Sequence, residues 1–340
     1  MKNTLSAVMA MILAAGALAS CAKQEESNPT PAVSAASSPE AEQTVYKLGV
    51  IQLVEHDALD ASYKGFIDAL KAEGFEDGKN LKIDYHNAQG EQANCNTIAS
   101  KLVNDRNDLI LAIATPAAQA VANATQDIPI LVTAVTDPAD AKLVASNEAP
   151  GGNVSGTSDL TPIKEQIDLL HQLLPQAKKV GIIYNSSETN SQFQAKLARE
   201  AATALGIEAI DYTISSSNEL QQVVESAIGK VDALYAPTDN MVAAGISTIT
   251  MVATPAKLPV IAGEEALIPK GALATYGINY YNLGKQTGLQ AAKILRGEAE
   301  PATMPIEYLS DLSLSINTTA AKACGITIPQ ELLDKATIVE

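Results

Sequence analysis

The sequence predicts an α/β fold built from two doubly wound lobes, each formed around a parallel sheet. Strand-like and helix-like segments alternate from residue 47 onwards, which is the pattern of βαβ units. Phrases of the first half recur in the second, as KLGVIQ at 47–52 does in KVGIIY at 179–184. The body after residue 44 has about 296 residues, which exceeds a usual single domain and suits two lobes.

The first half contains the segments of one doubly wound lobe. KLGVIQL at 47–53 is a continuous apolar run, which is typical of a strand buried on both faces. The segment 61–75 carries apolar residues at helical spacing, namely Tyr63, Phe66, Ile67 and Leu70. We expect further strands at 81–86, 108–114 and 128–135, and further helices at 98–105 and 116–125.

The second half begins at residue 178 with KKVGIIY and repeats the order of the first. AEGFE at 72–76 corresponds to ALGIE at 204–208, and the paired phrases lie roughly 125 to 130 residues apart, which is too long for a solenoid repeat. This spacing indicates two lobes of like topology. The stretch 271–298 then predicts a strand and a helix, with apolar helix positions at Leu283, Leu289, Ala292 and Leu295.

The N-terminal residues predict an exported and lipid-anchored protein. One lysine precedes an apolar run from Leu5 to Ala19, which is too short to span a bilayer comfortably and is typical of a secretory signal. Leu18-Ala19-Ser20-Cys21 is similar to a bacterial lipobox, in which the cysteine becomes the lipid-bearing first residue. We predict a signal peptide at 1–20 and lipidation of Cys21. An uncleaved short anchor helix is the alternative.

The segment that follows Cys21 is predicted to be a disordered tether at 21–44. It is rich in proline and serine and has no aromatic residue, so it cannot bury enough surface to fold. Diacylated cysteine supplies the two acyl chains that stable anchoring needs. The folded body would then lie in the periplasm or at the cell surface, attached to either membrane.

Composition narrows the class of partner. The chain has 39 acidic against 23 basic residues, which argues against a nucleic-acid partner. Three histidines lie far apart in sequence and no Cys or His cluster has metal-ligand spacing, so we expect no metal and no cofactor. Cys95 and Cys324 remain after Cys21, and the sequence leaves open whether they form a disulfide, which a core of this size does not need.

Polar segments follow the predicted strands in both halves. They begin after Gln52, Ala114, Val135, Tyr184, Ala236 and Ala262. Helix capping explains any single one of these polar residues. However, ligands of doubly wound sheets bind at the carboxyl ends of the strands, where helix N-termini also present free N–H groups to anions. The segments therefore predict a ligand cleft between the lobes.

Catalytic motifs do not account for these residues. Gly156-Thr157-Ser158-Asp159 is followed by Leu160, where a nucleophile elbow needs glycine. GGNVSG at 151–156 lacks the lysine of a P-loop and the spacing of a dinucleotide fingerprint. Glu264 and Glu265 are adjacent and would point apart on a strand, unlike a glycosidase pair. We expect a binding protein and no enzyme.

Several phrases together resemble one family, the solute-binding lipoproteins of ABC importers of the tryptophan/tyrosine type. They are HDALD at 56–60, ATPAAQA at 114–120, VTDPADAKLV at 135–144, PGGNVSGTSD at 150–159, IIYNSSETNS at 182–191, APTDN at 236–240 and ATYGINYYNLGKQTG at 274–288. The phrases cover nearly the whole folded body in order.

This resemblance implies the type I periplasmic-binding-protein fold, in which two lobes close over a ligand about a hinge of three crossings. We place the crossings near 156–159, 276–278 and 309–312. Lobe 1 would then comprise 45–157, completed by about 277–309. Lobe 2 would comprise 158–276, completed by about 310–340.

The resemblance also implies a small ligand, with aromatic amino acids as the characterised class, and ABC permease and ATPase subunits as partners. A receptor that presents its liganded state to a membrane signalling partner is the alternative. An amino acid needs donors for its carboxylate and acceptors for its ammonium, because buried unpaired charges are costly.

We assign candidate residues to these roles. Thr115, Ser186 and Ser187 are candidates for the ligand carboxylate, and Asp137, Asp159, Asp239 and Glu264 for the ammonium. Leu59, Tyr184 and Tyr276 are candidates for an aromatic side chain. The other predicted ligand-binding residues are Gln52, His56, Ser158, Asn185, Glu188, Asn190 and Asn240. On these assignments, Asp239→Ala should weaken ligand binding far more than stability.

Overall fold

The computed structural model describes residues 44–340 of the chain. The predicted signal peptide, the lipidated Cys21 and the tether up to residue 43 lie outside the described residues. Within 44–340, no helix is both long and apolar enough to cross a membrane.

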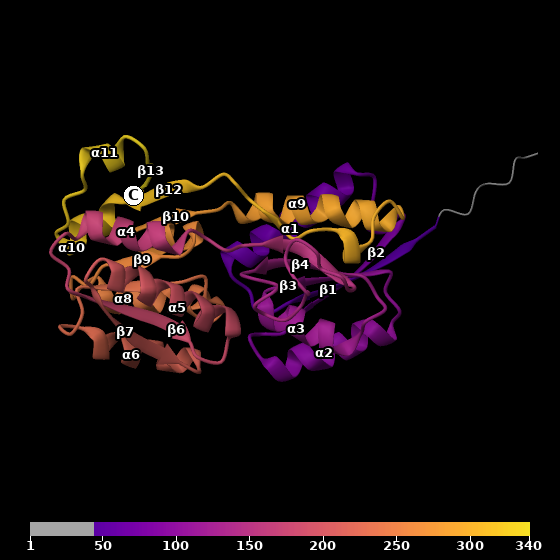
Figure 1. Cartoon of the computed structure of the whole chain (residues 1–340), viewed down its shortest axis with the longest axis horizontal. Coiled ribbons are helices and arrows are strands. Elements are labelled where there is room, and N and C mark those ends of the chain that lie inside the picture. The colour runs from indigo at the N-terminus through magenta and orange to yellow at the C-terminus, as the bar shows by residue number, and fades with distance from the viewer. Residues whose placement is uncertain (1–43) are drawn as a thin grey trace, which may run out of the picture. The chain divides into compact units, whose positions relative to one another are not determined.

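The first of two sheets has every neighbouring pair of strands parallel. Its order is β11 (Glu307–Tyr308), β5 (Val154–Ser158), β4 (Ile130–Val135), β3 (Leu109–Ile113), β1 (Tyr46–Gln52) and β2 (Leu81–Asn87). Helices α1 (Asp57–Ala72) and α9 (Tyr280–Leu295) cover one face, and α2 (Gln92–Asn104) and α3 (Thr115–Ala124) the other (Figure 1). We call this sheet with its helices the first lobe.

The second sheet, with its helices, is the second lobe. Its order is β13 (Thr337–Val339), β12 (Ser313–Asn317), β10 (Ala274–Gly277), β9 (Val260–Ala262), β8 (Ala233–Ala236), β6 (Lys179–Asn185) and β7 (Glu208–Ile214). Its neighbours are parallel except β10 and β12, because β12 enters from the first lobe and runs in the opposite direction. The prediction of an α/β fold with two doubly wound, parallel-sheet lobes is confirmed.

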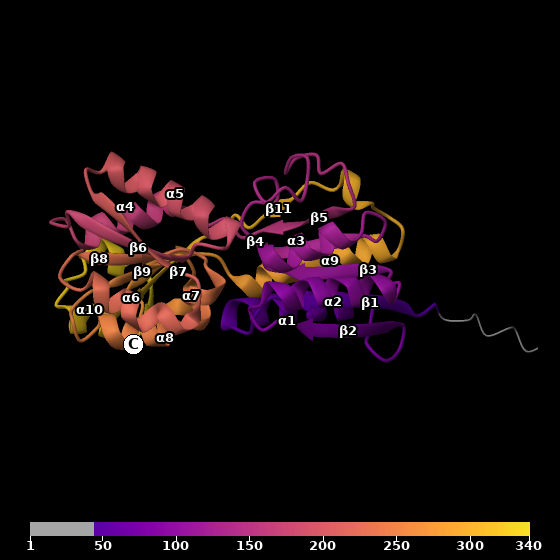
Figure 2. The ribbon, with the colours of Figure 1, turned by 90° about the horizontal axis from the view of Figure 1, so that it is seen from below.

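Helices cover both faces of the second sheet as well (Figure 2). One face packs against α4 (Ile163–Leu173), α5 (Thr189–Ala204) and α10 (Thr318–Cys324). The other packs against α6 (Leu220–Ala227), α7 (Asn240–Ala244), α8 (Ile246–Ala253) and the 3-10 helix η2 (Glu265–Lys270). Shorter elements are η1 (Ser217–Glu219), η3 (Pro301–Thr303) and α11 (Gln330–Leu333).

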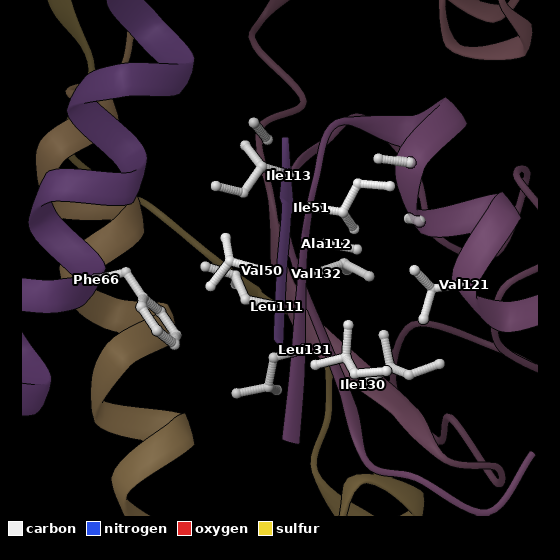
Figure 3. Packing of buried hydrophobic residues seen from close by; sticks show 14 of the residues in the cluster. Val50, Ile51, Phe66, Leu111, Ala112, Ile113, Val121, Ile130, Leu131 and Val132 are labelled. Atoms are coloured by element: carbon white, nitrogen blue, oxygen red, sulfur yellow. The ribbon is translucent and has the colours of Figure 1, made fainter. Parts of the chain in front are cut away.

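The strand segments of the first lobe are buried on both faces, as their continuous apolar runs predict. Val50 lies on the side of Phe66 and helix α1, whereas the next residue, Ile51, lies on the side of Val121 and helix α3 (Figure 3). This alternation follows from the pleat of the strand, which points successive side chains to opposite faces. Each lobe therefore has a core of its own.

Helices α1 and α9 pack closely against each other on one face of the first sheet. Gly65 of α1 lies against the backbone of Tyr281, and Gly284 of α9 lies against the backbone of Ser62. A Cβ atom at either glycine would overlap the facing backbone. The absence of a side chain at these two positions therefore sets the distance between the helices.

The chain passes between the two sheets three times. The connections run from the end of β5 to α4, from the end of β10 to α9, and from β11 to β12. Cys95 and Cys324 are both free among the described residues, and Cys95 is buried. Helix α1 begins at Asp57, earlier than the apolar periodicity predicts, because the acidic residues Asp57 and Asp60 suit a first turn.

Candidate functional site

A small cavity lies between the lobes at the carboxyl ends of strands from both sheets. The free volume is about 10 Å³, which is room for roughly one water molecule. From the first lobe it is lined by His56, Leu59, Ala134, Thr136, Asp159 and Tyr280. From the second lobe it is lined by Asn190, Thr238, Asp239, Asn240 and Glu264.

Two carboxylates in the wall have an oxygen that no other described residue satisfies. Asp159 follows β5, and its Oδ2 accepts a hydrogen bond of 2.7 Å from the Tyr280 hydroxyl, whereas its Oδ1 is buried without a partner. Glu264 follows β9, and its Oε1 is likewise buried and unpartnered. Such groups are costly unless something donates to them. They point to a ligand with hydrogen-bond donors or positive charge.

The pKa values of both carboxyls are raised above their ordinary values. Burial raises the pKa of Asp159 to about 6, although hydrogen bonds from Tyr280 and Thr136 lower it. Burial, and then the charge of Asp159, raise the pKa of Glu264 to about 8. Lys270, which pairs with Asp57 at 2.8 Å, lowers the pKa of Glu264. The pair can therefore release protons when a cationic group enters.

A chain of buried polar groups joins the lobes beside these carboxylates. Asn240 Nδ2 donates to Glu188 Oε2 at 2.6 Å, which turns Asn240 Oδ1 towards His56 Nε2 at 3.5 Å. Burial lowers the pKa of His56 to about 4, so the imidazole is neutral. Burial and the nearby Asp239 raise the pKa of Glu188. Its carboxyl lies behind Asn240, outside the cavity wall.

Asp239 lies in the wall, but its oxygens are occupied within the second lobe. Oδ2 accepts from the backbone N–H of Asn185 and from the Ser191 hydroxyl, both at 2.6 Å, and Oδ1 accepts from the N–H of Val242 at 2.8 Å. Asp239 is thus the N-cap of α7. Helix capping, the alternative that the sequence left open, accounts for this residue.

The effect of Asp239→Ala is therefore expected mainly on stability. The substitution leaves three buried donors without their acceptor, and we expect a loss of about 2 kcal/mol in the free energy of unfolding. Urea denaturation of the ligand-free protein would measure it. A loss of affinity with unchanged stability, as the sequence alone suggested, would instead place this carboxylate against the ligand.

Several predicted residues lie outside the cavity wall: Gln52, Thr115, Asp137, Ser158, Tyr184, Asn185, Ser186, Ser187, Glu188 and Tyr276. The side chain of Gln52 is turned towards Asp60, which accepts from its Nε2 at 2.6 Å. Asp137 closes its own turn by accepting from Ala139 N–H at 2.9 Å. These two residues shape the loops that carry the wall.

The remaining residues outside the wall have other surroundings. Thr115 and Ser158 are buried, and the Ser158 hydroxyl donates to the carbonyl of Thr136 at 2.6 Å. Asn185 accepts from the exposed Ser187 hydroxyl at 2.7 Å, and Ser186 is also exposed. Tyr184 and Tyr276 belong to strands and pack on the face covered by α4 and α5, because strand side chains point away from the sheet edge.

Sequence reasoning missed four residues of the wall. Thr136 and Thr238 are neighbours of predicted residues, so the strand-end rule could have included them. Ala134 has a left-handed backbone with φ of 53°, and the sequence gives no signal for this conformation at an alanine. Tyr280 begins α9, far along the chain, and only the packing of α9 against α1 brings it to the site.

Helix N-termini add donors to this region. His56 precedes α1, and no described side chain caps the first turn of that helix. The free N–H groups of such a turn attract anions. Among residues 44–340, no group of His, Cys, Asp and Glu is arranged to hold a metal ion. The site can therefore offer acceptors for a cationic group and N–H donors for an anionic one.

The known proteins that this chain resembles are substrate-binding proteins, which agrees with a ligand site between the lobes. Residues 47–340 match the model of the family described as ABC transporter substrate binding protein. A tyrosine-binding protein of Clostridioides difficile strain R20291 is 43% identical over 326 residues, which cover 95% of this chain and 92% of that protein.

Two solved structures extend the comparison. An ABC domain from Streptococcus pneumoniae in complex with L-Trp is 38% identical with a TM-score of 0.84, covering 87% of this chain and 100% of that one. The ligand-free, open structure of a substrate-binding protein with adhesive properties from Clostridium difficile is 46% identical, but its TM-score is 0.66, covering 87% and 99%. The lobes here are thus arranged more like those of the L-Trp complex. The predicted type I periplasmic-binding-protein fold is confirmed.

Proposed function

Because the chain belongs to the family of ABC transporter substrate-binding proteins, we propose that it is the lipid-anchored solute receptor of an importer and that it binds an aromatic L-amino acid between its lobes. The family consists of extracytoplasmic binding proteins without enzymatic activity. The receptor would deliver its ligand to a membrane permease driven by an ATPase. Lipidation of Cys21 would keep it at the membrane.

One observation carries the proposal. Asp159 begins the connection after β5 and is bonded to Tyr280 of the first lobe, whereas Glu264 belongs to the second lobe. Their unpartnered oxygens, Asp159 Oδ1 and Glu264 Oε1, line one cavity. An α-ammonium group has three donors and one positive charge, so it can satisfy both oxygens at once. Both lobes would then hold the same group, and its binding would favour their closure.

The rest of an amino acid finds complementary groups nearby. The uncapped first turn of α1, next to His56, would donate N–H groups to the α-carboxylate. Leu59 and Tyr280 would provide apolar contact for an aromatic side chain. The tyrosine-binding relative and the L-Trp complex support this ligand class.

Capture requires the lobes to move apart. The cavity volume of about 10 Å³ is far below that of any amino acid. The three connections between the sheets are the segments about which the lobes would rotate. The better agreement with the L-Trp complex than with the open structure supports a closed arrangement here.

A thermal-shift screen of residues 44–340 tests the ligand class. Each of the twenty amino acids, together with nucleosides, sugars and small peptides, would be added to the ligand-free protein, since a ligand of the native state raises the melting temperature. We expect a rise with L-tyrosine, L-tryptophan or both. A rise confined to nucleosides or sugars would overturn the ligand class, and deletion of the gene without loss of amino-acid uptake would favour the sensory alternative.

Affinity for an amino acid is expected to increase from about pH 6 to about pH 8. The ligand ammonium stabilises the ionised forms of Asp159 and Glu264, whose pKa values burial raises to about 6 and about 8. Binding therefore releases protons, and calorimetry in buffers of different ionisation enthalpy would count them. The stability of the ligand-free protein should instead decrease as the pH rises through this range. The raised pKa values mean that the folded protein binds more protons than the unfolded chain, which favours folding at low pH. Affinity independent of pH would exclude the pair from the site.

A further inference from the structure

The buried amide of Gln194 makes a cross-lobe contact that the proposed function does not use. Gln194 lies on α5 of the second lobe and is fully buried. Its Nε2 donates to Thr136 Oγ1 of the first lobe at 3.1 Å. Thr136 lines the cavity. The contact therefore joins the lobes directly beside the ligand site.

The direction of this hydrogen bond is fixed by contacts within the second lobe. Gln194 Oε1 accepts from the backbone N–H of Thr238 at 3.2 Å and from the Thr238 hydroxyl at 2.9 Å. Its Nε2 also donates to the Thr238 carbonyl at 3.2 Å. These three bonds do not involve the first lobe, so they can hold the amide ready before the lobes close.

A hydroxyl that accepts from an amide must direct its own hydrogen elsewhere. Thr136 lines the same cavity as Asp159, and it lowers the pKa of the Asp159 carboxyl. Donation from Gln194 to Thr136 thus leaves the Thr136 hydroxyl hydrogen free for an acceptor in the cavity that it lines, and it strengthens that donor by polarisation. The arrangement exists only when the lobes are together.

We propose that Gln194 is a positioning residue for ligand recognition: on closure it orients the Thr136 hydroxyl as a donor in the cavity and thereby couples lobe closure to affinity. This inference rests on the proposed function for the identity of the ligand. It does not depend on which aromatic amino acid is bound.

A double-mutant cycle tests the coupling with L-tyrosine and L-tryptophan as probes. We expect Gln194→Ala and Thr136→Val each to raise Kd about tenfold. The double variant should also raise Kd about tenfold instead of a hundredfold, because both substitutions remove the same interaction. Gln194→Ala also removes the bonds to Thr238 and can destabilise the second lobe. Thr136→Val leaves those bonds intact, so its affinity and melting temperature separate recognition from folding.

Gln119→Ala is the matched control. Gln119 Nε2 donates across the lobes to Thr189 Oγ1 at 3.3 Å, which is the same chemistry at an exposed position. The Kd of the Gln119→Ala variant should stay within about twofold of the Kd of the unmodified protein. Additive effects in the cycle, or an equal effect of Gln119→Ala, would overturn the positioning role.

A second measurement separates this inference from the proposed function. If the unmodified protein binds neither probe, the ligand class is wrong, and small-angle scattering of the ligand-free protein then decides the inference. We expect a larger radius of gyration for Gln194→Ala and Thr136→Val than for Gln119→Ala, because the closed fraction falls. Equal radii in all three variants would refute the cross-lobe role.

Discussion

Replacement of Glu264 by glutamine is expected to weaken the binding of L-tyrosine or L-tryptophan on the order of 100-fold, because it removes one of two buried countercharges for the ligand ammonium. Glutamine keeps the shape of the side chain. Stability of the ligand-free protein should fall little, since Glu264 Oε1 has no partner to lose among the described residues. Isothermal titration calorimetry at pH 8, near the raised pKa of the Glu264 carboxyl, would measure the loss.

Glu265→Gln provides the control for this substitution. Glu265 is the next residue, is partly exposed and does not line the cavity. It should bind ligand as the unmodified protein does. If both variants lost affinity equally, the effect would be a general change in charge, and if neither did, Glu264 would not contact the ligand.

The largest loss of stability is expected from Gly284→Ala. The added Cβ would overlap the backbone of Ser62, and neither packed helix can yield without opening the core of the first lobe. We expect a loss of about 3 kcal/mol or more in the free energy of unfolding. This corresponds to a melting temperature roughly 10 °C lower, which calorimetry would detect.

Lys285→Ala is the matched control for helix α9. Lys285 follows Gly284 in the same helix and is exposed, so alanine changes only helix propensity there. Its melting temperature should remain within a few degrees of the unmodified protein. Equal melting temperatures for the two variants would show that the helices have room to separate.

The fold could be predicted from the sequence because its signals are local. A continuous apolar run such as 47–53 identifies a buried strand, and a helical apolar spacing such as that of 61–75 identifies the following helix. The edge at which ligands bind then follows from the parallel arrangement. Glu264 was found in this way, since it lies two residues after the strand that ends at Ala262. Asp159 came instead from the phrase PGGNVSGTSD that resembles the family, because no strand was predicted before it.

The details of the site depend on information that no short segment holds. Whether an aspartate after a strand faces a ligand or caps a helix depends on which donors surround it, and for Asp239 three donors of its own lobe decide the matter. Tyr184 was proposed as a contact for an aromatic ligand side chain, but the pleat directs it into the core. Tyr280 reaches the cavity through packing between distant helices.

The position of α9 in the first lobe also has a consequence for how the chain folds. Helix α9 comes late in the sequence, yet it covers the first sheet, while the second sheet is completed only by β12 and β13. Each lobe therefore needs segments from both sides of the other, and these contacts of long sequence separation form slowly. During synthesis from the N-terminus, neither lobe can be completed until α9 has been made. The chain therefore stays incompletely folded, and able to pass through a narrow channel, for most of its length.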